Sequence, residues 1–245
     1  GSTFTYAYGN YNTAATQFNW TFNATPPTML ITSAEVSNGD TSNDAALTMT
    51  FEASEETTNF AEGDIMVSGG ALSDFTQETP LKYTATFTPT TDGATTIDVA
   101  TSKFRDSARN NNTAATQFNW TFNATKPTMT IFAIEADDGD TSNDAALTLI
   151  FEASEATTDF TEDDITVSGG ALYDFTQETS SKTEYSATFT PSSDGATTID
   201  VDGSTFTDAY GNNNTAAIQF YWTFDSTPPT MPITSAEVSN GDTSN

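Results

Sequence analysis

The chain has 245 residues and a net charge of -28, because 34 aspartates and glutamates stand against only six lysines and arginines. It contains no cysteine and no histidine, which excludes a disulfide-stapled fold and the usual zinc, copper and thiol chemistry. So negative a field repels nucleic acid and anionic membrane surfaces and attracts cations.

The chain repeats itself at a spacing of about 100 residues. The sequence NTAATQFNWTFNAT at 12–25 returns unchanged at 112–125, and it reappears as NTAAIQFYWTFDST at 214–227. A proline-bearing junction follows each copy, and repeats of this length are whole domains. We predict two complete domains, 27–126 and 127–228. Residues 1–26 then correspond to the C-terminal strand of a preceding repeat, and residues 229–245 to the N-terminal strand of a following one.

Isolated strand fragments are marginally ordered in water. We therefore expect neighbouring copies or repeats, in a longer array or filament, to complete these two terminal segments.

Short runs of alternating polar and apolar residues lie between clusters of Gly, Pro, Asn and Asp, and this pattern predicts strands joined by turns. In the first repeat the strands are expected near 28–36, 45–53, 57–60, 64–68, 81–89, 94–100 and 113–123. They recur 100 residues later, and 102 residues later after a two-residue insertion near Ser180. No segment has a helical period. About seven strands in 100 residues predict an all-β fold, with each domain an antiparallel immunoglobulin-like β-sandwich.

The order of motifs PPT, GDTSND, FEASE, DI.VSGGAL.DFT, ATFTP, DGATTIDV, NTAA and WTF resembles the bacterial Ig-like repeats that occur in tandem in large surface proteins and adhesins. The resemblance covers both complete repeats and both terminal segments, and it implies a spacer or stalk. A family loop of the form Asp-Ala-x-Gly-Asn is intact at 208–212, whereas Arg109 stands at the glycine position in the first repeat.

Calcium is the cofactor that the loops suggest. Hard divalent cations take six to eight oxygen ligands, and the loops here are rich in carboxylates and Asn amides. In an Ig sandwich the loop after the first strand lies at the pole where the chain leaves, and two other loops share the pole where it enters. Loop residues of one domain can therefore face those of the next. The candidate ligands are Asp40, Asn43, Asp44, Asp140, Asn143, Asp144, Glu155, Asp208 and Asn212.

The alternative is that GDTSND is a polar turn whose Asp and Asn side chains bind the local backbone. Both interpretations stay open from the sequence. The first repeat is the weaker calcium candidate, because Arg105 and Arg109 place positive charge where a cation would sit.

Asn-x-Thr triplets make glycosylation a second hypothesis, although such triplets also arise by chance in a threonine-rich chain. They begin at Asn19, Asn23, Asn111, Asn119, Asn123 and Asn213. Use of these sites would imply a eukaryotic, secreted source.

Two further patterns have structural explanations. The three tryptophans each have an aromatic residue two positions away on the same strand face, which favours core packing over a sugar platform. Adjacent acids such as Asp137 and Asp138 point apart on a strand or turn, unlike the paired carboxylates of a glycosidase.

We therefore predict a non-catalytic, extracellular structural protein, secreted or on the cell surface, which forms a stalk, adhesin shaft or filament stiffened by calcium. Its partners are other copies or repeats and a surface ligand at a distal module, without nucleic acid or membrane insertion. The alternative is a carbohydrate- or surface-ligand-binding module of an adhesin. The loop sequence GDTSNDAALT is identical in both repeats, and this favours the spacer.

Overall fold

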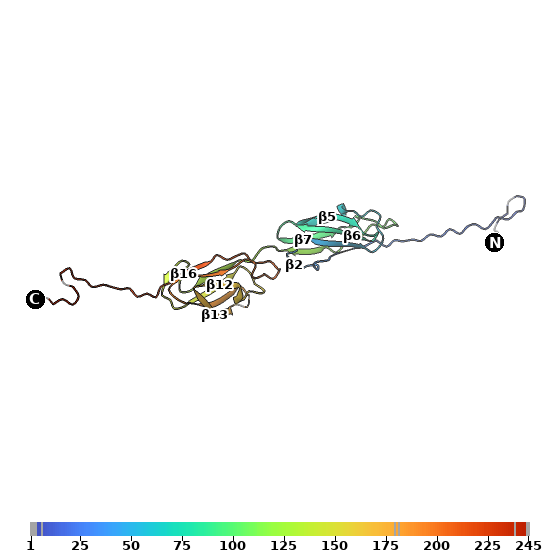
Figure 1. The fold of residues 1–245 in the computed structure, drawn as a ribbon. Coiled ribbons are helices and arrows are strands. Elements are labelled where there is room, and N and C mark those ends of the chain that lie inside the picture. The colour runs from blue at the N-terminus through green and yellow to red at the C-terminus, as the bar shows by residue number, and fades with distance from the viewer. Residues whose placement is uncertain (1–3, 6, 179, 181, 238, 244–245) are drawn as a thin grey trace. The chain divides into compact units, whose positions relative to one another are not determined.

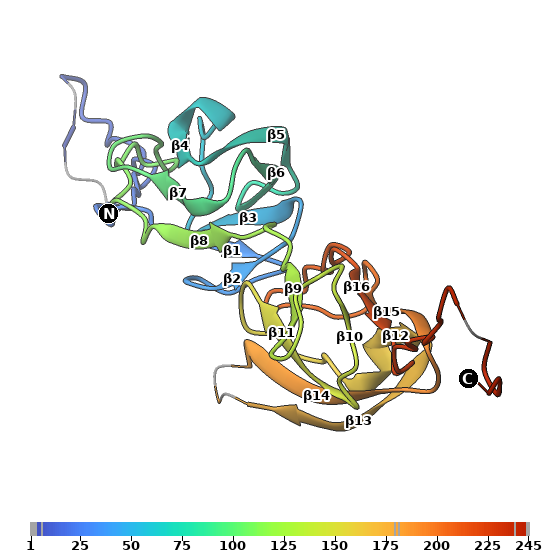
Figure 2. The ribbon, with the colours of Figure 1, turned by 90° about the vertical axis from the view of Figure 1, so that its left-hand side faces the viewer.

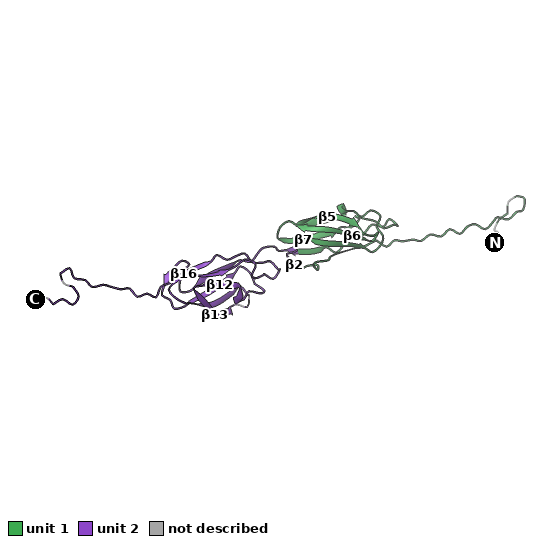
Figure 3. Cartoon of the chain, in the orientation of Figure 1, with its two compact units in different colours: residues 1–40, 45–120 green, residues 41–44, 121–245 purple. Residues whose placement is uncertain are grey.

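The structure is a computed structural model that describes residues 4–5, 7–178, 180, 182–237 and 239–243. The chain forms two compact units: the residues up to Asp40 together with Ala45–Trp120, and Thr41–Asp44 together with the residues from Thr121 onward (Figure 3). Each contains one β-sandwich, so the predicted all-β immunoglobulin-like fold is confirmed.

The first sandwich has two four-stranded sheets, in the orders β1-β3-β6-β5 and β2-β8-β7-β4 (Figure 1). Its strands are β1 (Met29–Ser33), β2 (Thr41–Ser42), β3 (Leu47–Ala53), β4 (Ile65–Ser68), β5 (Gly70–Gln77), β6 (Lys82–Pro89), β7 (Gly93–Val99) and β8 (Phe118–Phe122). A short 3-10 turn, η1 (Glu62–Asp64), leads into β4.

The second sandwich repeats this plan, with the sheets β13-β14-β11-β9 and β10-β16-β15-β12. Its strands are β9 (Met129–Ala133), β10 (Thr141–Ser142), β11 (Leu147–Ala153), β12 (Ile165–Ser168), β13 (Gly170–Gln177), β14 (Glu184–Pro191), β15 (Gly195–Val201) and β16 (Phe220–Phe224), with the 3-10 turn η2 (Glu162–Asp164) before β12. The two 3-10 turns are the only helical segments in the part of the chain that the structure describes, and neither approaches the length of a membrane-spanning helix.

Strand alternation explains why these residues form sheets. In β3 the apolar side chains at positions 47, 49, 51 and 53 are buried, while the intervening threonines and Glu52 face outward or lie at intermediate depth. A tryptophan completes each core: Trp120 meets Phe87 edge to face at 6.3 Å, and Trp222 meets Phe189 in the same way.

The strand bounds differ from expectation at three places. The segment 70–77 was predicted as a connection, but it forms β5, which pairs with β6 across a bulge. The segment 57–60 contributes only an isolated bridge from Thr57 to Asp106, and the last strand begins at Phe118 rather than at 113. The sheets are also not wholly antiparallel, because β2 runs parallel to β8 and β10 parallel to β16.

The described residues of 4–28 form a single bridge, from Thr5 to Tyr11, and those of 225–243 form no strand. Phe18 and Trp20 are 86% and 71% exposed, whereas the identical Phe118 and Trp120 are 2% and 1% exposed. The aromatic sequence is therefore buried only where sheet partners surround it.

The assignment of Trp222 to the core of the second domain can be tested directly. Trp222→Ala should lower the free energy of unfolding of the second domain by about 3–5 kcal/mol, because it removes a large buried ring and leaves a cavity. Tyr221→Ala is the matched control on the same strand. Tyr221 is 51% exposed, so its loss should cost no more than about 0.5 kcal/mol. Urea titration followed through residue-resolved amide NMR signals separates the two domains, and equal effects of both variants would contradict the assignment of Trp222 to the core.

Candidate functional site

A hydrogen-bonded polar cluster lies in the connection from β15 to β16 of the second domain. Asp208 is buried, and its Oδ1 accepts hydrogen bonds from the backbone N–H groups of Tyr210 and Asn212, each at 2.8 Å. Its Oδ2 accepts from Asn212 Nδ2 at 2.9 Å. Gly211, with φ at 87°, allows the tight turn between them. This is the loop that the sequence identified at 208–212.

The first domain has the same arrangement at Asp106. Asn110 donates to Asp106 Oδ1 from its backbone N–H at 2.7 Å and to Oδ2 from its side chain at 2.8 Å. Burial alone would raise the pKa of Asp106, but the hydrogen bonds from Asn110 and from the backbones of Ala108 and Arg109 together outweigh burial and hold this pKa below the usual value. Arg109, at the glycine position, has φ at 74°, so the first domain keeps the left-handed turn with a less suitable residue.

Each of these loops also holds the segment that leads into its own domain. Asn212 Nδ2 donates to the carbonyl oxygen of Asn123 at 3.1 Å, and Asn110 Nδ2 donates to that of Asn23 at 3.1 Å. A second backbone bond follows in each domain, from Thr215 to the carbonyl of Pro127 at 3.0 Å and from Thr113 to that of Pro27 at 3.1 Å. The entering segment is therefore fixed at two points before the first strand begins.

Glu155 lies beside this loop in the second domain. Burial raises the pKa of its carboxyl group, and the negative charge of Asp208 raises it further. Its counterpart Glu55 accepts a hydrogen bond from Asn23 Nδ2 at 3.0 Å. Two carboxylates that repel one another at a loop of oxygen-bearing side chains form the kind of site that a divalent cation stabilises.

The remaining predicted calcium ligands have mainly local partners. Asp40 and Asp140 accept hydrogen bonds from backbone N–H groups three residues earlier, at 2.7 and 3.1 Å. Asp44 and Asp144 accept from the hydroxyls of Ser42 and Ser142, at 2.7 and 2.6 Å. These are the bonds that the polar-turn interpretation expects, and Asn143 is simply exposed.

Asn43 differs from these residues. It belongs to the second compact unit, and its Nδ2 donates to Asn212 Oδ1 at 3.3 Å. Glu155, Asp208, Asn212 and Asn43 together offer oxygen ligands of the type that calcium prefers. The described residues contain no group of three or more acidic side chains placed to hold a metal. Two carboxylates fit a calcium ion only if amide oxygens, backbone carbonyls and water supply its other ligands.

Two structural asparagines, Asn112 and Asn214, were not among the predicted site residues. Asn112 Oδ1 accepts from the backbone of Lys103 and Phe104, and its Nδ2 donates to the carbonyls of Ala100 and Thr113. Asn214 makes the equivalent four bonds in the second domain. The signal was present, because this asparagine opens all three copies of the NTAA motif. These residues brace the loops that carry Asp106 and Asp208.

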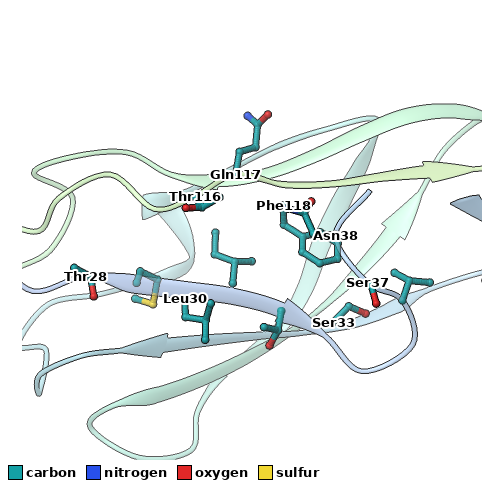
Figure 4. A pocket seen from close by; sticks show the side chains of 12 residues that line it. Thr28, Leu30, Ser33, Ser37, Asn38, Thr116, Gln117 and Phe118 are labelled. Carbon is teal, nitrogen blue, oxygen red and sulfur yellow. The ribbon is translucent and has the colours of Figure 1, made fainter. Parts of the chain in front are cut away.

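A groove of about 650 Å³ lies in the first sandwich. It runs between β1 and the segment that leads into β8, with Thr28 and Leu30 on one wall and Thr116 and Gln117 on the other (Figure 4). None of its lining residues is titratable, so the groove offers no group for acid-base catalysis. The corresponding groove of the second sandwich is about 220 Å³, with Ile218 at the position of Thr116.

The six predicted glycosylation asparagines lie in different environments. Asn19, Asn111, Asn119 and Asn213 are exposed, whereas Asn23 and Asn123 are partly covered. The side-chain oxygens of Asn23 and Asn123 accept bonds from Thr25 and Thr125, and Asn111 accepts one from Arg105 Nε at 2.8 Å. Four of the six triplets therefore present an accessible asparagine.

A sandwich of this topology, with its tryptophan core and its braced loops, defines an Ig-like domain. The family model for the bacterial Ig-like domain matches the chain twice, at residues 23–122 and 123–221, and the chain belongs to this family. The resemblance seen in the sequence is confirmed. The family match begins each domain about four residues before the boundaries that we predicted at 27 and 127.

Similar solved structures include FdeC, an Escherichia coli adhesin, with 14% identity over 79% of this chain and 63% of that one, at a TM-score of 0.43. Invasin, a bacterial integrin-binding protein, has 15% identity over 80% of this chain and 40% of that one, at a TM-score of 0.40. InvD of Yersinia pseudotuberculosis has 16% identity over 90% of this chain and 67% of that one, at a TM-score of 0.33. This chain spans less than two thirds of the FdeC and invasin structures. No curated protein sequence matches it.

The charge repulsion at Glu155 predicts a pH dependence. The folded-state pKa of Glu155 is raised, so ionisation of this group destabilises the folded domain above that pKa, and protonation removes the penalty at low pH. Without divalent cations, Glu155→Gln should stabilise the second domain at pH 7 by less than about 1 kcal/mol, because the group is largely solvated, and should have no such effect near pH 3.

Urea unfolding in EDTA at the two pH values measures this difference. Glu55→Gln in the first domain is the control, and it should not stabilise that domain, because Glu55 accepts a bond from Asn23. A Glu155→Gln variant less stable than the parent at pH 7 would contradict the repulsion.

Proposed function

We propose that the chain is a non-catalytic, extracellular segment of a bacterial surface protein, and that it serves as a stalk, adhesin shaft or filament. The observation that carries the proposal is the attachment of each entering segment to its own domain, through Asn110 in the first and Asn212 in the second. Prolines at positions 26–27 and 127 further restrict the backbone there. A linker that is fixed in this way transmits force and limits bending.

Each domain has the same type of core and the same braced loops, as expected of repeated spacers. Neither groove between the first and last strands contains a catalytic constellation, and the larger has no ionisable lining residue. The acidic surface keeps such a protein soluble and discourages non-specific association outside the cell.

We further propose that neighbouring repeats or copies supply partners for the terminal segments. The support is internal to the chain, since residues 118–122 form a strand with a buried face where partners exist, and the identical residues 18–22 form none. The alternative function is a carbohydrate- or surface-ligand-binding module of an adhesin, and the surface described below supports a binding role for the second domain.

The linker attachment has its own test. Asn212→Ala removes the side-chain bonds to the Asn123 carbonyl and to Asp208, so residues 123–126 should become more mobile. We expect at least tenfold faster amide exchange in this segment, equivalent to about 1.4 kcal/mol of local stability. Asn213→Ala is the neighbouring control at an exposed position and should leave the exchange unchanged. Equal exchange in both variants would remove the attachment argument.

Calcium is the second element of the proposal, with Glu155, Asp208, Asn212 and Asn43 as ligands in the second unit. Calcium that binds only the folded state should raise the unfolding free energy by about 2.7 kcal/mol at one hundred times its Kd. Thermal unfolding in calcium and in EDTA measures this effect, and Asp208→Asn should abolish the calcium-dependent part. An unfolding midpoint that EDTA leaves unchanged would eliminate the cation and leave a spacer stiffened by hydrogen bonds alone.

A further inference from the structure

The two domains differ in the outward face of one sheet, which in the second domain is β13-β14-β11-β9. At four positions the first domain has Thr32, Ala34, Thr50 and Ser73. The second domain has Phe132, Ile134, Ile150 and Tyr173 at the equivalent positions, and we call these four residues the apolar sheet patch. The backbone is the same in both domains, including the bulge on the edge strand and the positive φ of 55° at Asp74 and Asp174.

Strand register places the four side chains on one face of the sheet, with Phe132, Ile134 and Ile150 on neighbouring strands and Tyr173 beyond Thr188 on the edge strand. Phe132 lies opposite Ile150 on the neighbouring strand. Ile134 donates its backbone N–H to Thr148, and Thr148 lies opposite Thr188, which in turn lies opposite Tyr173. The two rows are two residues apart along the strands, so they occupy one face of the sheet. Figure 2 labels the strands β9, β11, β14 and β13 of this sheet.

The apolar sheet patch is open to solvent. Phe132, Ile134 and Tyr173 are 41%, 68% and 55% exposed, and Ile150 is partly covered. Isolated exposed apolar residues need no explanation, but a contiguous group with a polar rim is typical of an interaction surface. Phe132, Ile134 and Ile150 form such a group, and Tyr173 lies on the same face across Thr188. Because the first domain forms the same sheet with Thr32, Ala34, Thr50 and Ser73 at these positions, the sandwich does not require the four larger side chains for its own stability.

The charge beside the apolar sheet patch also differs between the two domains. In the first domain Glu52 lies opposite Lys82 on this face, an oppositely charged cross-strand pair. In the second domain the equivalent pair is Glu152 and Glu184, and two like charges directly opposite destabilise a sheet. Glu178 lies close by and accepts a hydrogen bond from Ser186, in the row that contains Ile150.

Glu135 supplies acid on the opposite side of the patch. Its carboxylate accepts hydrogen bonds from the backbone N–H and the hydroxyl of Thr148, both at 2.7 Å. The rim is therefore acidic on two sides.

We propose that the apolar sheet patch is a docking surface for a protein segment that carries aromatic or aliphatic side chains flanked by lysine or arginine. Apolar contact would come from the patch, and the basic residues would relieve the repulsion between Glu152 and Glu184. A second copy of this chain is a poor occupant, since it would bring the same carboxylates to a surface that is already acidic. This inference is independent of the stalk role, because a shaft domain can carry a binding face.

The test uses the full chain, three nine-residue synthetic peptides and a neutral cello-oligosaccharide as a fourth probe. The first alternates lysine with leucine and tyrosine, the second has glutamate in place of lysine, and the third has serine in place of leucine and tyrosine. Amide NMR titration reports which residues respond, and only the first peptide should shift signals of β9, β11 and β13 in a saturable way.

The first domain supplies matched variants. Reversion of the patch by F132T/I134A/I150T/Y173S should weaken binding of the first peptide about tenfold or more, the size expected when a few anchor residues are lost. The reversion should still fold, because the first domain has these residues in the same register, and the dispersion of the amide spectrum checks this. Glu184→Lys, which restores the Glu–Lys pair of the first domain, should weaken binding separately and reduce its dependence on salt.

Transfer of the patch is the converse experiment. The variant T32F/A34I/T50I/S73Y/K82E should create a second binding face on the first domain, with new shifts in β1, β3 and β5.

Three results would overturn the proposal. The first is absence of binding by the lysine-leucine-tyrosine peptide, and the second is equal affinity of the parent and the reverted chain. The third is patch-dependent binding of a neutral cello-oligosaccharide in place of the cationic peptide, which would assign the face to carbohydrate instead. None of these results bears on the linker attachment, which Asn212→Ala tests.

Discussion

A half-buried strand is stable only when a second sheet covers its apolar face, and this constraint governs both domains. The chain contains its own comparison, since residues 12–25 and 112–125 are identical. In the second copy Trp120 is 1% exposed and meets Phe87, whereas in the first copy Trp20 is 71% exposed and meets Phe22, two residues away. The non-local contact between tryptophan and the opposite sheet, rather than local propensity, therefore decides whether this sequence is a buried strand.

Turns, unlike strands, form with partners that are close in sequence. In the N-terminal segment Asn12 Oδ1 accepts from the Phe4 backbone, and the Asn12 N–H donates to the Phe4 carbonyl. Asn112 and Asn214 make the same bonds inside complete domains. The turn therefore forms without a sandwich around it, while the strand that follows does not. In each complete domain, the loop that this turn closes holds the entering segment.

The same distinction explains what the sequence could predict. The alternation in β3, β6 and β7 is strong, and these strands were found within about two residues. The strand β5 was missed because it opens at Gly70 and contains Asp74, and both residue types are typical of turns. Asp74 indeed has a left-handed conformation within the strand. Gly70 is needed for contact rather than for turning, since a Cβ there would lie 2.5 Å from the Thr88 carbonyl oxygen. Such a contact across strands cannot be seen in a sequence. The motif at 208–212 is visible in the sequence, but the neighbours of this loop, the carbonyl of Asn123 and the like charge of Glu155, depend on the tertiary fold.

The two tandem repeats are alike in their loops and differ on an outward sheet face. Comparison of loops alone suggests that the two domains are equivalent, because GDTSNDAALT is identical in both. These loops are under structural constraint, since the side chains of Asp40, Asp44, Asp140 and Asp144 close their turns. Outward positions of a strand are not, because every second residue faces solvent and can change without altering register or core. A repeat protein can therefore keep its linkers uniform and still give one domain a distinct surface, and the change from Thr50 to Ile150 and from Lys82 to Glu184 lies where that freedom is greatest.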